Sequence, residues 1–402
     1  MDAETFDARI PEYVKPAQVF EFDIYDDERL KADLHAGFKS LHADAPDIFY
    51  TPRNGGHWMV TRYDLITSVM CDSEHFSNAE MDVPKSASKY VMIPLNLDPP
   101  DHAPYRAVLM RYFSPKAVGA LEDRMRGWAE RLIDKVAGDG HCDLAELGAA
   151  FPVSIFMEIM GLPMERFDDF RKVVVEFFSK ISSERRIALK AEIFDEMNAI
   201  IEARSIERRE DLISHLLDEK VNGRSLTRDE LQSICFLLFI AGLDTVANTI
   251  AFAMRHLADD HLLQDRLQSD TAAIPKFVEE ALRVYAIVNG VRTVKRDFDF
   301  NGVAFREGDM VVCSLPLGGL DERKYPDPTR FDIDRTERQH VTFSVGPHLC
   351  VGHYLARAEM RILTQSWLSR IPRFYMAPDF TPEFRAGFVM SLKHVPVEWQ
   401  IP

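Results

Sequence analysis

Residues 234–254, ICFLLFIAGLDTVANTIAFAM, are the most apolar stretch of the chain, and any fold must find a place for them. A stretch of this length could cross a bilayer. Four polar side chains between residues 244 and 249 interrupt it, however, and its longest uninterrupted apolar run, 234–243, is about half of what a bilayer requires. We therefore expect a long buried helix over 227–257, around which the other elements pack.

The start of this helix carries its own signal. Thr227 is followed three residues later by Glu230, a capping-box pattern in which the two side chains bond the free N–H groups of the first turn. Helical periodicity predicts further helices at 117–137, 152–160, 164–181, 186–206 and 274–286, and one after Cys350.

Strand patterns are confined to three patches, at 49–63, 293–313 and 388–399. The first contains a turn signal at 54–56 and the second at Asn301-Gly302. The sequence has no internal repeat, Gly/Ser-rich linker or low-complexity tract that would divide it. We predict a mainly α fold with small β-sheets, forming a single domain over 1–402.

Charge and cysteine content limit the partners and the kinds of site that the chain is expected to have. The chain has 48 Lys and Arg against 64 Asp and Glu, a formal charge of −16, which disfavours nucleic acid and anionic membrane surfaces as partners. The acidic, proline-broken N-terminus has neither the positive start nor the apolar run of a signal peptide, so we predict a cytoplasmic protein without a membrane anchor. The five cysteines include no C-x-x-C pair, which argues against a zinc site and a disulfide framework.

One cysteine stands out by its position. Cys350 ends the loop segment FSVGPHLC and is followed by a strong helical pattern, which places it at a helix N-terminus. The free N–H groups and the helix dipole there stabilise a negative sulfur, so we expect a lowered thiol pKa and a thiolate that can bind a metal. Gly346 and Gly352 flank it and would let the backbone approach a flat, bulky partner.

The spacing Phe343-x-x-Gly346-x-His348-x-Cys350-x-Gly352 resembles the haem-binding loop of the cytochrome P450 family. The resemblance implies haem b between the long central helix and the cysteine loop, with O2 as co-substrate. Cys350 would be the axial thiolate ligand that favours O–O cleavage, and His348 would bind a haem propionate.

Three other segments are similar to motifs of this family. Glu280-Ala-Leu-Arg283 resembles the buried pair that braces the proximal loop, although such a pair alone is usually a solvated ion pair. The segment 98–106 resembles one whose histidine and arginine, here His102 and Arg106, neutralise propionates. By its position after the helix that contains Glu280, Arg292 is expected to bind a propionate as well.

The third motif lies in the middle of the apolar helix. Ala241-Gly242-Leu243-Asp244-Thr245 resembles the oxygen-activation motif, which implies that Asp244 and Thr245 form a catalytic proton relay and that the helical bonding breaks locally at Thr245. Considered alone, Thr245 could instead bond its own helix backbone, and Asp244 could be an N-cap or ion-pair residue.

Several stretches, among them YVMIPLNLDPP and GLDTVAN, are similar to the bacterial camphor hydroxylases. Tyr90 matches the phenol that binds the camphor ketone, whereas Val91, Met92 and Phe388 depart from that pattern, so camphor itself is not expected. An apolar pocket with one polar anchor suits a small terpenoid ketone, such as a monoterpenoid or norisoprenoid. The expected pocket residues are Tyr90, Ile93, Leu95, Leu237, Ile240, Val288, Phe388 and Val389.

These motifs favour a monooxygenase that takes two electrons from a [2Fe-2S] ferredoxin, itself reduced by an NAD(P)H-dependent ferredoxin reductase. Between His102 and Lys135, seven cations face four acids, and this local excess would dock an acidic ferredoxin. Two alternatives are a peroxide-driven peroxygenase, which should not need the acid–alcohol relay, and a non-catalytic haem sensor.

Overall fold

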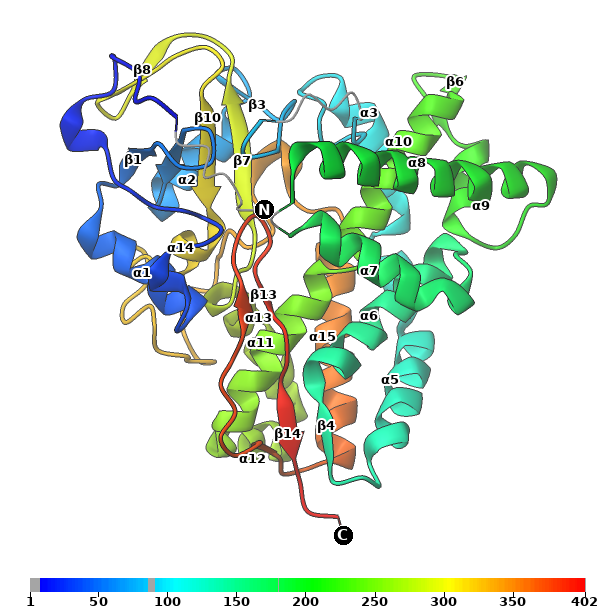
Figure 1. Ribbon diagram of the computed structural model, residues 1–402. Helices are drawn as coiled ribbons and strands as arrows, with labels where there is room; N and C mark the ends of the chain where they lie inside the picture. Colours follow the sequence, from blue (N-terminus) through cyan, green and yellow to red (C-terminus); the bar gives the residue numbers. More distant parts are fainter. Residues whose placement is uncertain (1–7, 86–90, 180, 402) are drawn as a thin grey trace.

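A computed structural model describes residues 8–85, 91–179 and 181–401. The chain is mainly helical with small sheets, which confirms the predicted fold class. In Figure 1 the large sheet lies on one side with the N-terminal helices, and the longer helices form the other side. The α-helices are α1 (Leu34–Asp44), α2 (Tyr63–Cys71), α3 (His102–Tyr112), α4 (Pro115–Gly119), α5 (Glu122–Val136), α6 (Leu144–Met160), α7 (Phe167–Phe177), α8 (Ser183–Ile206), α9 (Leu212–Asp218), α10 (Arg228–Gly242), α11 (Thr245–Asp259), α12 (His261–Ser269), α13 (Ile274–Val284), α14 (Leu315–Gly319) and α15 (His353–Arg370).

The large sheet has the strand order β1-β2-β10-β7-β3. Its β1–β2 hairpin turns at Asn54, Gly55 and Gly56, all with positive φ, as the first strand patch predicts. The β8–β9 hairpin turns at Asn301-Gly302, as the second predicts. The strands are β1 (Ile48–Thr51), β2 (His57–Val60), β3 (Phe76–Ser77), β4 (His141–Asp143), β5 (Lys220–Val221), β6 (Arg224–Ser225), β7 (Asn289–Val294), β8 (Phe298–Phe300), β9 (Val303–Phe305), β10 (Met310–Ser314), β11 (Tyr375–Met376), β12 (Phe384–Arg385), β13 (Ser391–Leu392) and β14 (Pro396–Glu398).

The apolar stretch is two helices, α10 and α11, rather than the continuous helix predicted over 227–257. The break falls at Leu243 and Asp244, where the Asp244 φ of −131° leaves the helical region. The capping box is confirmed, since Glu230 N–H donates to Thr227 Oγ1 over 3.2 Å and Thr227 N–H to Glu230 Oε2 over 2.7 Å. The span Arg228–Asp259 is long and apolar enough to cross a membrane, but 72% of its most apolar window is buried inside the protein.

Other helix boundaries differ from the predicted ones for local reasons. The helix predicted at 152–160 begins eight residues earlier, at Leu144, because Asp143 caps it by accepting a bond from Ala145 N–H. The helix predicted at 117–137 is divided into α4 and α5. Helices α1, α2, α3, α9, α12 and α14 were not predicted.

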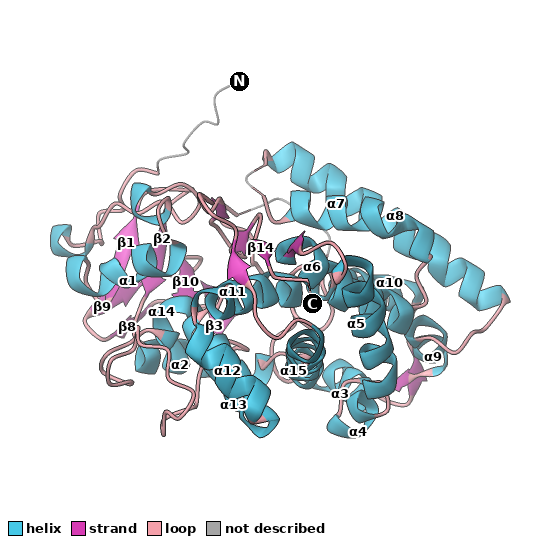
Figure 2. Cartoon of the chain, turned by 90° about the horizontal axis from the view of Figure 1, so that it is seen from below, coloured by secondary structure: helices cyan, strands magenta, loops and turns pink. Residues whose placement is uncertain are grey.

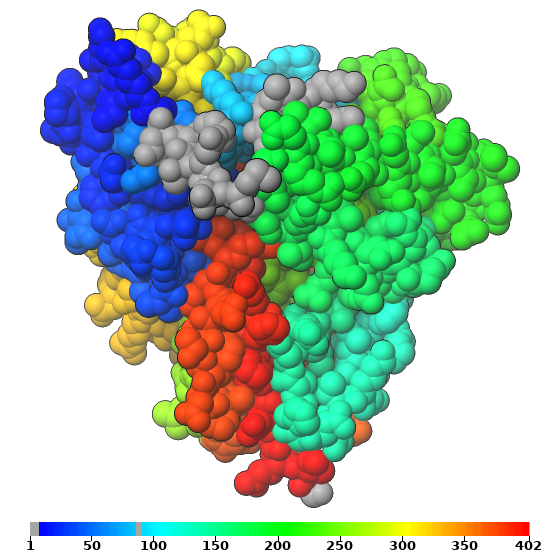
Figure 3. Space-filling model, in the orientation of Figure 1, coloured from blue at the N-terminus to red at the C-terminus, as the bar shows by residue number. Residues whose placement is uncertain are grey.

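Helices α6, α11, α13 and α15 pack together as the helical core, with α5 against both α6 and α15. Figure 2 shows α15 end-on, with α11, α13 and α5 around it. In Figure 3 the C-terminal residues fill the face between the N-terminal part and helices α6 to α8. The loop that contains Cys350 leads directly into α15, so the helical core fixes its position.

Candidate functional site

A cavity of about 360 Å³ lies between the α10–α11 helices and the loop that precedes α15. Its walls are largely apolar, and it is bounded on one side by Phe343 and Cys350 and on another by Thr245. The sequence-predicted residues that line it are Leu95, His102, Arg106, Leu237, Ile240, Thr245, Val288, Arg292, Phe343, His348, Cys350, Gly352, Phe388 and Val389.

Two predicted pocket residues do not fit this description. Ile93 does not line the cavity but packs half-buried against the core, and its neighbours Met92 and Pro94 face the cavity instead. The fold thus does not place Ile93 in the cavity wall with the other predicted pocket residues. Tyr90 lies outside the described residues.

The cysteine loop is held by its own backbone. Cys350 N–H donates to Phe343 O over 2.8 Å, and Leu349 N–H donates to Gly346 O over 3.2 Å. Gly346 has a φ of +70°, and an added Cβ would lie 3.0 Å from Cys71 Sγ, so packing against α2 requires glycine there. At Gly352 an added Cβ would lie 4.0 Å from Cys350 Sγ, an ordinary contact. Glycine at 346 thus allows the loop to pack against α2.

The thiol of Cys350 faces the cavity rather than bulk solvent. Burial raises its pKa, and this effect outweighs the opposing backbone hydrogen bond from Gly352 and the positive charge of Arg106. The shift is thus opposite to the lowered pKa predicted, because α15 begins only at His353 and the sulfur faces the enclosed cavity instead of a helix N-terminus. A metal ion would supply the missing positive charge, since a coordinating thiol is deprotonated outright.

Four basic side chains gather at the same end of the cavity. Arg106 donates to Leu349 O, and Arg292 Nη1 donates to Val291 O over 2.8 Å. The His102 and His348 rings lie 4.9 Å apart between their centroids. Burial, followed by the charge of Arg292, lowers the pKa of His348 to about 3.

This cluster has unused hydrogen-bonding capacity. Arg292 Nη2 and His102 Nδ1 are buried, and neither has a partner among the described residues. Burial also lowers the pKa of Arg292, as expected for a cation without a counter-ion. Such groups need an anion, and two carboxylates beside a thiol ligand match them well. The residues present therefore fit haem with its two propionates.

Thr245 and Asp244 lie at the helix break but face different ways. Thr245 lines the cavity, and its hydroxyl donates to Ala241 O over 3.0 Å. Asp244 is buried and does not line the cavity; its Oδ2 accepts from Arg385 Nη2 over 2.9 Å. Burial raises the pKa of Asp244, against the lowering effect of Arg385. The two alternative readings of these residues, a back-bonded hydroxyl and an ion pair, are therefore both present.

The Glu280–Arg283 pair is fully buried, with side chains 4% and 1% exposed. Arg283 binds both Glu280 oxygens, over 2.9 and 2.7 Å, and also donates to the carbonyls of Gly319 and Pro328. The pair thus fixes the segment 319–335 rather than touching the cysteine loop itself. One link to that loop is made by the preceding residue, Thr342, whose hydroxyl donates to Leu282 O over 2.6 Å.

Some cavity residues gave no sequence signal. Three aromatic side chains, Phe156, Phe177 and Phe178, line the cavity from α6 and the end of α7. Tyr25 and Arg186 line it as well. Only the helical periodicity around the phenylalanines could have indicated an inward face, and it does not distinguish a cavity wall from core.

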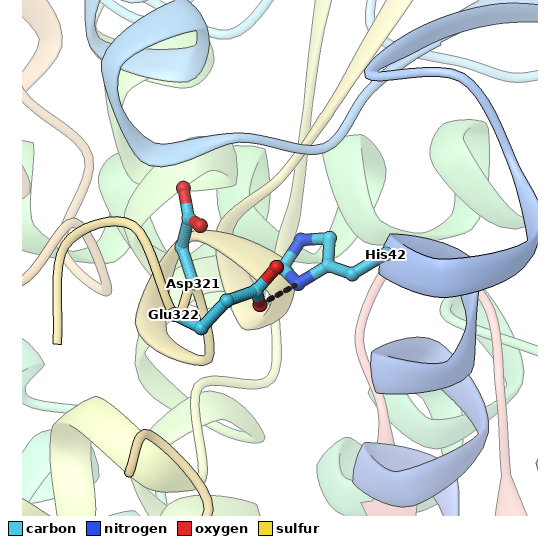
Figure 4. A group of neighbouring side chains, drawn as sticks. All are labelled: His42, Asp321 and Glu322. Atoms are coloured by element: carbon cyan, nitrogen blue, oxygen red, sulfur yellow. Dashed lines mark ion pairs between the residues drawn. The ribbon is translucent and has the colours of Figure 1, made fainter. Parts of the chain in front are cut away.

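A second cluster of possible metal ligands lies away from the cavity. His42, Asp321 and Glu322 have ligand atoms within 4.8 Å of one another, as Figure 4 shows. Arg62 Nη1 binds both acids, over 3.1 and 2.7 Å, and Lys39 also binds Glu322. Because two cations already neutralise the acids, this group is a structural ion-pair network and not a metal centre.

Comparison with known proteins decides the family. Residues 143–378 match the family model described as Cytochrome P450. Over 97% of both chains, the sequence is 34% identical to a probable cytochrome P450 127A1 of Sinorhizobium fredii. The chain belongs to the cytochrome P450 family. A steroid C26-monooxygenase of Mycobacterium tuberculosis is 29% identical over 91% of this chain and 93% of its own length.

Solved structures agree with this P450 assignment. CYP101J2 superposes with a TM-score of 0.90 at 35% identity, covering 98% of this chain and 100% of that one. CYP101C1 superposes with a TM-score of 0.89 at 31% identity, and the coverage of both chains is the same. Both support the similarity to camphor hydroxylase-type enzymes found in the sequence. As a P450, the protein is a monooxygenase that uses haem with an axial cysteine thiolate and O2.

Proposed function

We propose that this P450 hydroxylates a small apolar terpenoid, with Cys350 as the axial haem ligand. The observation that carries the assignment is the cavity itself, in which one thiol and four basic side chains share one end. His102, Arg106, Arg292 and His348 would hold the propionates. Bound haem supplies O2 activation, the chemistry that the chain's own side chains lack.

The substrate proposal rests on the cavity walls. Leu237 and Ile240 come from α10, Val288 precedes β7, and Phe388 and Val389 come from the turn between β12 and β13. These side chains offer hydrocarbon contacts on several sides, which suits a compact terpenoid skeleton. The test is to add small terpenoids to the haem-loaded protein and measure displacement of bound water as a Soret blue-shift. If monoterpenoids and norisoprenoids all leave the band unmoved, the proposed substrate class is wrong.

We further propose that Thr245 and Asp244 deliver protons during turnover. Thr245 is the hydroxyl at the helix break that faces the cavity, and Asp244 is the adjacent buried acid. Arg385 holds the carboxyl of Asp244 from β12, so it would position this acid rather than act on substrate.

The Thr245→Ala variant is expected to consume NADH with O2 while releasing mainly hydrogen peroxide, because proton delivery is interrupted when the hydroxyl is lost. Oxygen uptake, peroxide and product are measured together. Thr245→Ser, which keeps the hydroxyl, should retain most of the parent's coupling. Parental coupling in the alanine variant would remove Thr245 from the relay.

Electrons are proposed to come from a [2Fe-2S] ferredoxin and its NAD(P)H-dependent reductase, in the cytoplasm. Helices α3 and α4 offer the docking surface, because α3 carries Arg106 to the cysteine loop. Arg111 on α3 already pairs with Glu219 over 3.1 Å, whereas Lys116 on α4 is exposed and has no ion-pair partner among the described residues.

Lys116→Glu is therefore expected to slow ferredoxin-driven haem reduction several-fold at low ionic strength, and less at high salt, because association is steered by charge. Arg111→Glu should have a smaller effect, since Glu219 already offsets Arg111. Lys15→Glu makes the same charge change as a control, because Lys15 is also exposed and has no ion-pair partner among the described residues. Lys15 precedes the 3-10 helix Pro16–Gln18, which contacts β1, and β1 lies on the other side of the molecule from α4 (Figure 2). Equal rates for the Lys116 and Lys15 variants would place docking elsewhere.

A further inference from the structure

Arg186 is a cation at the end of the cavity away from the cysteine loop. It belongs to the first turns of α8, and it lines the cavity together with Tyr25, Phe177 and Phe178. Among the described lining residues, the other basic side chains, His102, Arg106, Arg292 and His348, gather beside the loop 347–350 or lie in it. Arg186 thus places positive charge where the haem-binding cluster does not reach.

Arg186 contacts carbonyls and an aromatic ring but no carboxylate among the described residues; its Cζ lies 5.9 Å from the centroid of the Phe177 ring. Nη1 donates to Phe177 O over 2.7 Å, and Nη2 donates to Ser179 O over 3.2 Å. Both acceptors are neutral carbonyls, and no carboxylate among the described residues pairs with Arg186. A guanidinium has five N–H donors, so several remain for a ligand.

The polar neighbours of Arg186 do not offset its charge. Burial raises the pKa of Tyr25 to about 12, so its phenol is neutral, and it donates to Val83 O over 2.7 Å. Asp82 also lines the cavity, but it forms an ion pair with Lys190 over 2.8 Å.

A ligand that fills this cavity therefore contacts the guanidinium of Arg186. A purely apolar ligand would displace water from Arg186 without forming hydrogen bonds to it, and this desolvation is unfavourable for a charged group. A carboxylate would replace the water with charge-assisted hydrogen bonds, for which the planar guanidinium is well suited. A site built to bind one polar group discriminates strongly against analogues that lack it.

We propose that the cavity binds a terpenoid-sized carboxylic acid, with its carboxylate on Arg186 and its hydrocarbon part directed along the phenylalanines toward Thr245 and Cys350. This inference rests on the proposed function, since it takes the cavity to be the substrate site. It refines that function by exchanging a ketone-bearing ligand for an acid. Arg186 would then determine both which ligand binds and which carbon lies nearest the thiolate.

The test uses two probes with one skeleton, perillic acid and its neutral aldehyde, perillaldehyde. Binding to the haem-loaded protein is measured by calorimetry and by the Soret shift. Arg186→Gln should weaken the binding of perillic acid about tenfold to a hundredfold, which is the usual contribution of a hydrogen bond to a charged group. The affinity for perillaldehyde should change less than twofold. Arg185→Gln is the matched control, because Arg185 pairs with Glu176 and Glu192 and does not line the cavity.

Arg186 also holds the end of α7, so a second measurement uses the parent protein alone. As the pH falls through the pKa of perillic acid, its affinity should fall while that of perillaldehyde stays constant. Arg186→Lys, which keeps the charge, should retain a preference for the acid. Equal losses for both probes in Arg186→Gln, or no pH-dependent difference in the parent, would overturn the proposal. Oxygenation of neutral terpenoids would still test the proposed function separately.

Discussion

Cys350→His is expected to abolish oxygenation and to remove the strongly red-shifted Soret band that the reduced, CO-bound parent should show. The Cys350 sulfur faces the cavity beside Arg106, and the backbone bond from Cys350 N–H to Phe343 O fixes its position. Histidine would present a neutral nitrogen, which cannot push electron density onto iron as a thiolate does. The CO difference spectrum and product formation are the measurements.

A matched cysteine separates this effect from the general loss of a thiol. Cys142 lies on β4 and does not line the cavity, and burial raises its pKa to about 12, so it is an inert thiol. Cys142→Ser should keep the parent spectrum and activity. If Cys350→His kept the red-shifted band, the ligand would have to be another cysteine.

Local sequence patterns predicted the parts of the site that are local in the chain. The Phe343–Gly352 spacing lies within one loop, and the Thr227 capping box lies within one helical turn. In both cases the residues that interact are neighbours in sequence, so their spacing alone predicts that they lie close together. The split at Asp244 was only partly predicted, because the apolar pattern continues across the break while the backbone does not.

Long-range partners could not be predicted in this way. Arg385 reaches Asp244 across 141 positions, and nothing near either residue indicates the other. The loop that contains Ile93 has no helical or strand period, so sequence does not show which of its side chains faces the cavity. The Cys350 pKa was misjudged for a related reason, since depth of burial depends on the whole fold.

Arg283 carries the largest expected effect on stability. Its side chain is 1% exposed, binds both Glu280 oxygens and donates to the carbonyls of Gly319 and Pro328. Arg283→Met would leave the Glu280 charge buried with only Arg335, at 3.3 Å, as a remaining ionic partner, and would free two buried carbonyls. Removing one partner of a buried pair costs about 3–5 kcal/mol in the free energy of unfolding.

A surface pair provides the comparison for this variant. Arg126 and Glu122 also lie on one helix, α5, but they are 3.8 Å apart and 39% and 34% exposed. Arg126→Met should therefore lower the free energy of unfolding by less than about 0.5 kcal/mol. Urea unfolding and haem retention are measured on both variants. Because Arg283 fixes the segment 319–335 that precedes the cysteine loop, its loss should release haem at lower urea than in the parent. Equal midpoints for the two variants would show that the buried pair does not support the fold.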